Sequence, residues 1–112
     1  MILIALVLSA ATADRWVHVG VGPNLYEEYV DTESITRNGD KVILWTRRDL
    51  VLDPGTAWTE LELDCRMRTE TILAYIRDDR RLVSHNMVRP HREASVIPPD
   101  SVAERIFNIA CR

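Results

Sequence analysis

Residues 57–68 read AWTELELDCRMR, and their side chains alternate between two sets. The mostly apolar set comprises Ala57, Thr59, Leu61, Leu63, Cys65 and Met67. The other set comprises Trp58 and the charged residues Glu60, Glu62, Asp64, Arg66 and Arg68. A period of two over a stretch of this length predicts a strand of an antiparallel sheet with one face in water. Because Cys65 belongs to the apolar set, we expect its partner to come from the segment that covers the apolar face.

The C-terminal segment is the best candidate for that cover. Pro98 and Pro99 interrupt the chain, and Ser101 and Glu104 then have the spacing of a capping box, in which each side chain bonds the other's free amide. Apolar residues follow at helical spacing, namely Val102, Ile106 and Ile109, flanked by Ala103, Phe107 and Ala110. We therefore predict a C-terminal helix on the apolar face of the sheet, with Cys111 at its end beside Cys65.

Cys65 and Cys111 are the only cysteines in the chain. In a small exported domain an even cysteine count favours a disulfide, and closing a loop of this length stabilises the fold by roughly 4 kcal/mol in the chain-entropy model. Free buried thiols and a metal-binding pair are the alternatives. Zinc takes three or four ligands at short spacings, and the sequence has no CxxC or HxxxH motif. We expect a Cys65–Cys111 disulfide, no metal and no cofactor.

Shorter patterns assign the remaining strands. We expect them over 16–21, 26–31, 41–48, 71–76 and 81–88, with Val17, Val19 and Val21 on one side of the first. Asn38-Gly39 predicts a hairpin turn because both residues tolerate positive φ, and Asp78-Asp79-Arg80 predicts a second hairpin tip. Together these patterns predict an α+β fold. It has an antiparallel sheet of about five to six strands with one C-terminal helix packed on one face, pinned by a disulfide.

The first thirteen residues differ from the rest of the 112-residue chain. Residues 1–13 carry no charge, and Ala11 and Ala13 fit the small-residue pattern that signal peptidase requires. Their apolar run is too short to span a bilayer, and a buried N-terminal strand or helix is the alternative. We predict a signal peptide over 1–13, with its basic n-region upstream of Met1, followed by a single domain over 14–112.

Ala11 also bears on where the protein resides. It stands where a lipoprotein signal carries the cysteine that receives the lipid, so we expect no lipid anchor. The expected location is therefore periplasmic or secreted, and display on the outer surface is disfavoured.

Charge and size exclude several classes of function. About 100 residues build one modest core, which excludes a two-lobed nucleotide fold. The net charge of −3 gives no basic field for nucleic acid. Thirteen arginines stand against the single Lys41. Arg66 and Arg68 on the wet face would suit a polyanionic glycan or lipopolysaccharide, although GC-rich codon usage explains the same excess.

Trp58 is the better candidate for binding a partner, because an exposed indole on a wet sheet face often anchors a protein. Catalytic patterns are absent from the sequence. His18, His85 and His91 share no ligand spacing, and Asp78-Asp79 fits a solvated turn better than an acid–base pair. The chain also lacks G-x-S-x-G and a phosphate-binding loop. We expect no catalytic residue and no enzyme.

With these residues assigned, the chain resembles the surface-adhesin protein E family of small Gram-negative envelope domains. The matching residues run in order through nearly the whole mature chain: Trp16-Val17, Tyr29-Val30-Asp31, Ser34-Ile35, Asn38-Gly39, Trp45, Glu62-Leu63-Asp64-Cys65, Arg66, Arg68, Tyr75, Ile97-Pro98-Pro99, Ser101 and Ala110-Cys111. The resemblance implies an antiparallel sheet with a C-terminal helix pinned by a disulfide. It also implies an envelope adhesin, since the family's named member binds host matrix proteins such as vitronectin and laminin.

The leading hypothesis is thus an exported, disulfide-stabilised, non-enzymatic binding module of the bacterial envelope. We expect a protein partner, from the host matrix or from the envelope itself. The alternatives are a small periplasmic enzyme or enzyme inhibitor, and an assembly factor of the outer membrane. A histidine beside two buried carboxylates would favour the enzyme.

Overall fold

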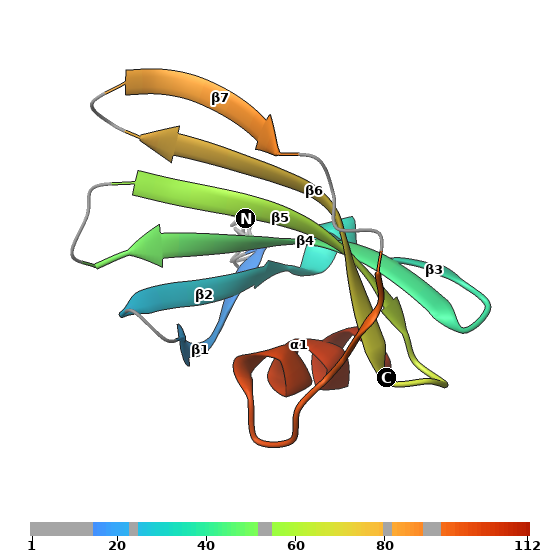
Figure 1. Ribbon diagram of the computed structural model, residues 1–112. Helices are drawn as coiled ribbons and strands as arrows, with labels where there is room; N and C mark the ends of the chain where they lie inside the picture. The colour runs from blue at the N-terminus through green and yellow to red at the C-terminus, as the bar shows by residue number, and fades with distance from the viewer. Residues whose placement is uncertain (1–14, 23–24, 52–54, 80–81, 89–92) are drawn as a thin grey trace, which may run out of the picture.

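One antiparallel sheet dominates the computed structural model, which describes residues 15–22, 25–51, 55–79, 82–88 and 93–112, with backbone alone at 79 and 82–88. The strand order is β1-β2-β4-β5-β6-β7 (Figure 1). These strands are β1 Trp16–Gly22, β2 Tyr26–Asp31, β4 Lys41–Leu50, β5 Gly55–Asp64, β6 Thr69–Asp79 and β7 Leu82–Val88. The smaller elements are the 3-10 turn η1 Thr32–Ser34, strands β3 Thr36–Asn38 and β8 Ser95–Val96, and helix α1 Val102–Ala110.

The hydrophobic core lies between α1 and the face of the sheet that curls around it (Figure 1). The sheet contributes Val19, Val30, Val42, Leu44, Leu61 and Leu63, and the C-terminal segment contributes Ile97, Ile106, Phe107 and Ala110. Buried and half-buried residues alternate along the whole of β5, as its sequence predicts. The predicted α+β fold, with one helix on one face of an antiparallel sheet, is confirmed.

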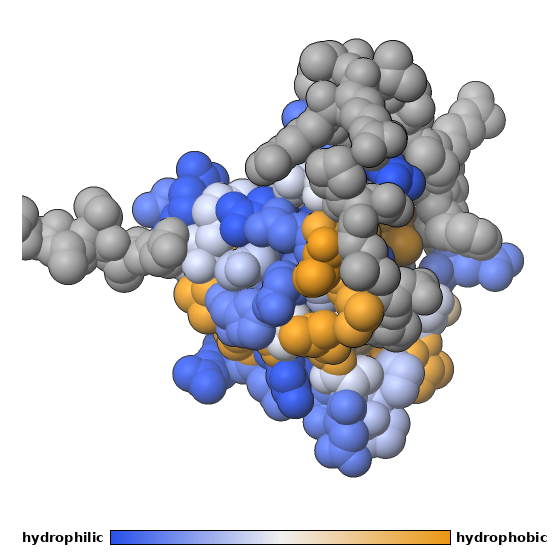
Figure 2. Space-filling view, turned by 90° about the vertical axis from the view of Figure 1, so that its left-hand side faces the viewer, coloured by the Kyte–Doolittle hydropathy of each residue, from blue (hydrophilic) through white to orange (hydrophobic). Residues whose placement is uncertain are grey.

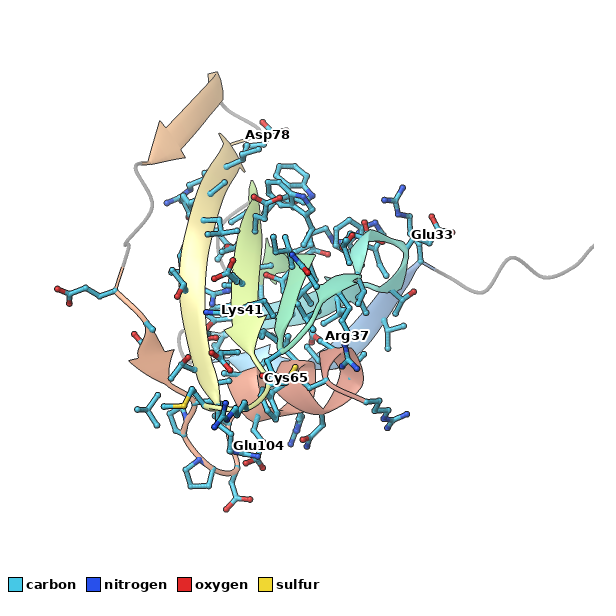
Figure 3. All side chains as sticks on the ribbon, turned by 90° about the vertical axis from the view of Figure 1, so that its right-hand side faces the viewer. Glu33, Arg37, Lys41, Cys65, Asp78 and Glu104 are labelled. Atoms are coloured by element: carbon cyan, nitrogen blue, oxygen red, sulfur yellow. A yellow bond between two sulfur atoms is a disulfide. The ribbon has the colours of Figure 1, made fainter. Side chains whose placement is uncertain are left out.

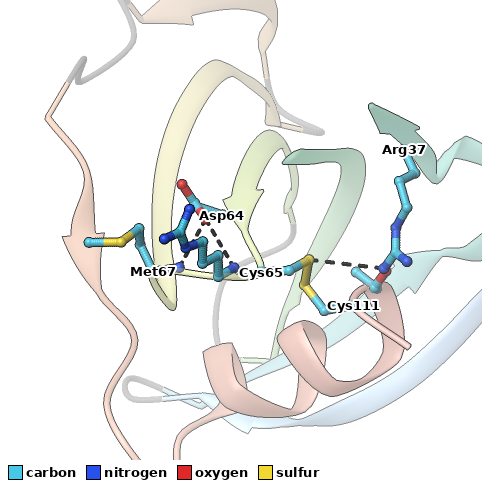
Figure 4. The surroundings of a disulfide bond; sticks show 7 residues. Arg37, Asp64, Cys65, Met67 and Cys111 are labelled. Atoms are coloured by element: carbon cyan, nitrogen blue, oxygen red, sulfur yellow. Dashed lines mark hydrogen bonds between the residues drawn. A yellow bond between two sulfur atoms is a disulfide. The ribbon is translucent and has the colours of Figure 1, made fainter. Parts of the chain in front are cut away.

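A disulfide joins Cys65, just after β5, to Cys111 at the end of α1 (Figure 4). The two Cα atoms are 5.6 Å apart. Arg37 on β3 donates a hydrogen bond of 3.3 Å to the carbonyl oxygen of Ala110 and also approaches Cys65 Sγ at 4.0 Å. A cation is favourable here, since the last carbonyls of a helix have no partner within the helix. The predicted Cys65–Cys111 bond is confirmed.

The strand through Cys65 ends earlier than its alternating pattern predicts. β5 stops at Asp64, and residues 65–68 form a turn. Asp64 Oδ1 accepts hydrogen bonds from the N–H groups of Arg66 and Met67, at 3.0 and 2.9 Å (Figure 4). Such local bonds offer the backbone an alternative to the sheet ladder. Met67 is consequently 66% exposed, so its predicted place on the apolar face is wrong.

The predicted valine face of β1 is also wrong. Its register against β2 shifts between His18 and Gly20, which turns neighbouring side chains to different faces. Val19 is buried, whereas Val17 and Val21 are exposed. Arg105 of α1 explains the irregularity, because its Nη1 donates a 3.0 Å hydrogen bond to the carbonyl oxygen of Val19. Gly20 lies so close to the same guanidinium that a Cβ atom there would stand 2.6 Å from Nη1.

The sequence predicts two hairpin turns, one at Asn38-Gly39 and one at Asp78-Asp79-Arg80. The hairpin predicted around Asp78-Asp79-Arg80 is present, since β6 and β7 pair antiparallel as far as Asp79 opposite Leu82. Asp78 and Asp79 themselves belong to β6, and Arg80 lies outside the described residues. Asn38-Gly39 forms the predicted turn between β3 and β4, with Gly39 at φ 61°.

Ser101 caps α1 through the hydrogen bond that its Oγ accepts from the N–H of Glu104, at 3.1 Å. The reciprocal half of the predicted capping box differs, because Glu104 Oε1 accepts from the N–H of Asp100. No helix in the described part of the chain is long and apolar enough to cross a membrane.

Candidate functional site

The outer face of the sheet, turned away from α1, carries one row of side chains across five strands. Register places His18, Tyr29, Arg47, Trp58 and Ile76 opposite one another on β1, β2, β4, β5 and β6. We call these five residues the cross-strand row. Ring contacts join His18 to Tyr29 and Tyr29 to Arg47 within the row, and cross-strand pairs of this kind stabilise a sheet.

Arg47 holds the centre of the row between two aromatic rings. Its guanidinium carbon lies 4.4 Å from the ring centre of Tyr29 and 4.9 Å from that of Trp16. Both distances lie within the range of cation–π attraction. Asp49 anchors the other side of the guanidinium, with 3.2 Å between Arg47 Nε and Asp49 Oδ1. Arg47 Nη2 also donates a 3.3 Å hydrogen bond to Asp49 Oδ2, so the guanidinium has an ion pair as well as its two ring contacts.

Trp58 is half-buried, so its sequence-based description as an exposed indole is wrong. Register explains its burial, because it lies between Arg47 on β4 and Ile76 on β6. Its indole is one part of an aromatic surface, and Trp45 adds another half-buried indole to the same face.

Acidic groups surround this aromatic surface. Glu27 contacts His18, and Glu62 and Asp64 share Lys41 at 3.6 and 3.5 Å. The hydrogen bond from the backbone N–H of Met67 is the largest cause that lowers the pKa of Asp64 below its usual range. The outer face thus combines aromatic rings with fixed negative charge.

The edge of the outer face near β1 carries one further ion pair. Arg15 and Asp31 form a 2.6 Å ion pair there, and the hydrogen bond from Arg15 lowers the pKa of Asp31.

The structure separates the two predicted arginines from Trp58. Arg66 and Arg68 lie in the turn that follows β5, and Trp58 lies toward the other end of that strand. Arg68 binds Glu104 at 3.1 Å and stacks over the ring of Phe107 at 4.7 Å, so its charge serves the fold. Figure 3 shows Glu104 and Cys65 at the helix end of the sheet, with Asp78 at the opposite end. Arg66 and Arg68 therefore do not extend the cross-strand row.

A cavity of about 440 Å³ lies on the other face, between the sheet and the start of α1. Its polar lining comprises Tyr26, Glu28, Arg48, Glu70, Asp100 and Ser101. Its apolar lining comprises Val21, Pro98, Val102, Ala103 and Ile106. Sites for small molecules commonly have this size and this mixture of an apolar wall with a few polar groups.

Glu28 and Glu70 give the cavity its charge. Glu28 is almost completely buried, and its Oε1 lies 3.3 Å from Arg48 Nε. Burial raises the pKa of Glu28, with the Arg48 charge acting in the opposite direction. Burial also raises the pKa of Glu70, the negative charge of Glu28 raises it further, and the charge of Arg48 acts in the opposite direction. Perturbed carboxylates in a concave site mark a candidate for binding.

Sequence reasoning missed this cavity, although a signal was present. Glu28 lies two residues before Val30 on β2, and Glu70 lies two residues before Ile72 on β6, so each glutamate is at the strand spacing of an apolar residue. A carboxylate at an inward position of a strand is costly and so indicates a special environment. The curl of the sheet, which brings β2 and β6 toward the same space, has no comparable local signal.

His18 does not join these carboxylates. His18 packs edge-on against Tyr29, with 5.3 Å between ring centres, and contacts Glu27 on the outer face. The side chain of His85 and all of His91 lie outside the described residues. Within the described ranges, no three His, Cys, Asp or Glu side chains come together as metal ligands.

One side of the molecule gathers hydrophobic residues in its middle, with hydrophilic residues around them (Figure 2). The large hydrophobic residues that are more than half exposed are Val21, Leu25, Val51, Met67 and Val96. Leu25 and Val51 lie at neighbouring strand ends, where the N–H of Val51 bonds the carbonyl of Leu25 at 3.1 Å. Val21 also lines the cavity, so one of these exposed groups stands at its entrance.

The fold defines a class of small protein: a curled antiparallel sheet whose concave face holds one C-terminal helix, fixed by a disulfide. The family model for surface-adhesin protein E matches residues 16–112, and the chain belongs to this family. No curated protein matches the chain. The solved structure of Haemophilus influenzae protein E superposes with a TM-score of 0.66 at 16% sequence identity. The match covers 88% of this chain and 84% of that one, which establishes the shared fold.

Proposed function

We propose that this protein is an exported, non-enzymatic binding module that contacts a partner protein through the outer face of its sheet. Membership in the surface-adhesin protein E family supports an adhesin-like surface protein. The observation that carries the proposal is the cross-strand row, which presents half-buried aromatic rings on a face that α1 does not cover. Aromatic residues and arginine are the groups that most often anchor protein partners.

The charges around the row favour one kind of partner. Glu27, Glu60, Glu62 and Asp49 lie on this face, with Lys41 and Arg47 as the cations that pair with part of them. A protein surface with exposed lysine or arginine side chains complements such a border, whereas a polyanion would be repelled by it. The arginine count suggests a glycan or lipopolysaccharide as an alternative partner. Such a partner would have to bind at the turn that contains Arg66.

Replacing one indole of the outer face, that of Trp58, tests the proposed binding surface. We expect Trp58→Ala to weaken binding at least tenfold, since anchoring residues cost 2 kcal/mol or more when truncated. The probes are purified vitronectin and laminin, the host matrix proteins that the family resemblance implies, tested by biolayer interferometry with the oxidised chain. Met67→Ala serves as the matched control, because Met67 is exposed in the turn beyond the other end of β5.

Equal binding of Trp58→Ala and the native chain would contradict the assignment of the outer face, provided that circular dichroism shows both chains folded. Failure of the native chain to bind either probe would contradict a host-matrix partner. Recovery of the protein from the cytoplasm of fractionated cells would contradict export.

A further inference from the structure

The cavity between the sheet and α1 contains more negative than positive groups. Three carboxyl groups line it, those of Glu28, Glu70 and Asp100, against the one guanidinium of Arg48. Arg48 is already engaged, since it pairs with Glu28 and stacks over the ring of Tyr26 at 4.6 Å. The lining therefore has more carboxyl groups than cationic groups.

Glu70 is the group without a counter-charge in contact. Among the described residues its side chain has no hydrogen bond and no ion pair, although burial and the charge of Glu28 both act on it. A carboxylate held in such a place costs free energy unless a cation or a hydrogen-bond donor reaches it. The charge of Arg48 acts in the opposite direction and lowers the pKa of Glu70, but Arg48 forms its ion pair with Glu28. Within the described residues, no cation or hydrogen-bond donor contacts the Glu70 carboxyl group directly.

The N-terminus of α1, which also borders the cavity, does not make it an anion site. Ser101 Oγ accepts the N–H of Glu104, and the Glu104 carboxylate accepts the N–H of Asp100. The helix therefore supplies its own acceptors, and its own carboxylate offsets the positive end of the helix dipole.

The walls of the cavity select an organic cation over a metal ion. Val21, Val102 and Ile106 provide apolar surface beside the carboxylates. Calcium takes six to eight oxygen ligands, and a wall of valine and isoleucine cannot supply them. The ring of Tyr26 is held in place by Gly22, where a Cβ atom would stand 2.3 Å from that ring. The site is therefore preformed on its aromatic side.

We infer that this cavity binds a small organic cation, an ammonium or guanidinium group on a short alkyl chain, with Glu70 and Glu28 facing the charge and the helix residues packing the alkyl chain. This site lies on the opposite face of the sheet from the cross-strand row. The inference is thus independent of the proposed protein-binding function.

Isothermal titration calorimetry of the oxidised full chain tests the charge selection. The probes are n-butylamine and N-butylguanidine, both protonated near neutral pH, with butyrate as the control of equal length and opposite charge. We expect saturable binding of at least one cation and no binding of butyrate. Absence of binding by both cations, or equal binding of butyrate, would overturn the inference.

Two variants test the site itself. Glu70→Gln keeps the shape of the side chain and is expected to weaken cation binding about tenfold or more, since a hydrogen bond to a charged group contributes about 1.5–3 kcal/mol. Glu62→Gln removes the same charge from the outer face and should leave binding unchanged. Equal loss in both variants would show that only net charge matters, which would overturn the assignment to this cavity.

NMR locates the bound probe without any variant. Titration with the bound cation should shift the methyl signals of Val102 and Ile106 and leave the indole signal of Trp58 in place. The opposite pattern would place the cation on the outer face and refute the inference, while saying nothing against a protein partner there.

Discussion

The carboxyl group of Glu70 makes the free energy of unfolding depend on pH. Its pKa is raised by burial and by the charge of Glu28, so the folded chain keeps a proton at pH values where the unfolded chain has lost it. The free energy of unfolding therefore falls as pH rises from the ordinary pKa of a glutamate through the raised pKa of Glu70. Neutral pH is the unfavourable side for this residue.

Replacing Glu70 by Gln removes that cost. We expect the variant to have a higher free energy of unfolding than the native chain near neutral pH, and a smaller difference near pH 4, where the Glu70 carboxyl group is mostly protonated. Urea denaturation followed by circular dichroism at the two pH values measures this difference.

Asp31 provides a control of opposite sign. Its pKa is lowered, chiefly by the hydrogen bond from Arg15, so its contribution to stability is present near neutral pH and is lost as pH falls below the ordinary value. Asp31→Asn should therefore be destabilising near neutral pH and less so in acid. A Glu70→Gln difference that does not change with pH would contradict the account of Glu70.

At the scale of elements, α1 contributes three buried residues to the core. Its buried face, formed by Ile106, Phe107 and Ala110, fills the curl of the sheet, and Arg68 stacks on Phe107 from outside. Phe107→Ala should lower the free energy of unfolding by about 3–5 kcal/mol, as is usual for a buried phenylalanine. Asn108→Ala, on the exposed side of the same helix, should change it by less than about 0.5 kcal/mol.

Thermal unfolding of the two variants checks this prediction. A loss below about 1 kcal/mol for Phe107→Ala would mean that α1 is not seated on the sheet as described, because truncation of a buried aromatic ring costs several times more.

The elements differ in how far the sequence predicts them. Strong periodicity in the sequence predicts β5 and α1. The faces on which these periods place Cys65 and Cys111 predict the disulfide between them. The periodicity does not predict where β5 ends. The Asp64 side chain accepts hydrogen bonds from two backbone N–H groups that a continued strand would have used in the sheet. The irregular β1 depends on Arg105, a contact 86 residues away along the chain.

The candidate sites depend even more on such distant contacts. Sequence reasoning selected Trp58, and the structure adds four neighbours from four other strands to form the cross-strand row. The sequence shows Glu28 and Glu70 at unusual strand positions, but it does not show that they line one cavity, because only the curl of the sheet brings them together. Local patterns thus predict which face a side chain takes, and the curvature of the sheet decides what it faces.

At the scale of the whole molecule, the disulfide fixes α1 to one of the two faces of the sheet. It holds α1 against the concave face, where the cavity lies, and leaves the cross-strand row uncovered on the other. A disulfide persists in an oxidising compartment, which the proposed export would provide. Formation of this bond in the cell is therefore the central claim.

Mass spectrometry of protein taken from fractionated cells, alkylated before any reduction, tests that claim most directly. We expect the protein in the envelope or secreted fraction, with its Cys65 and Cys111 peptides joined by a disulfide and carrying no alkyl group. Protein found in the cytoplasm with both cysteines alkylated would contradict the account.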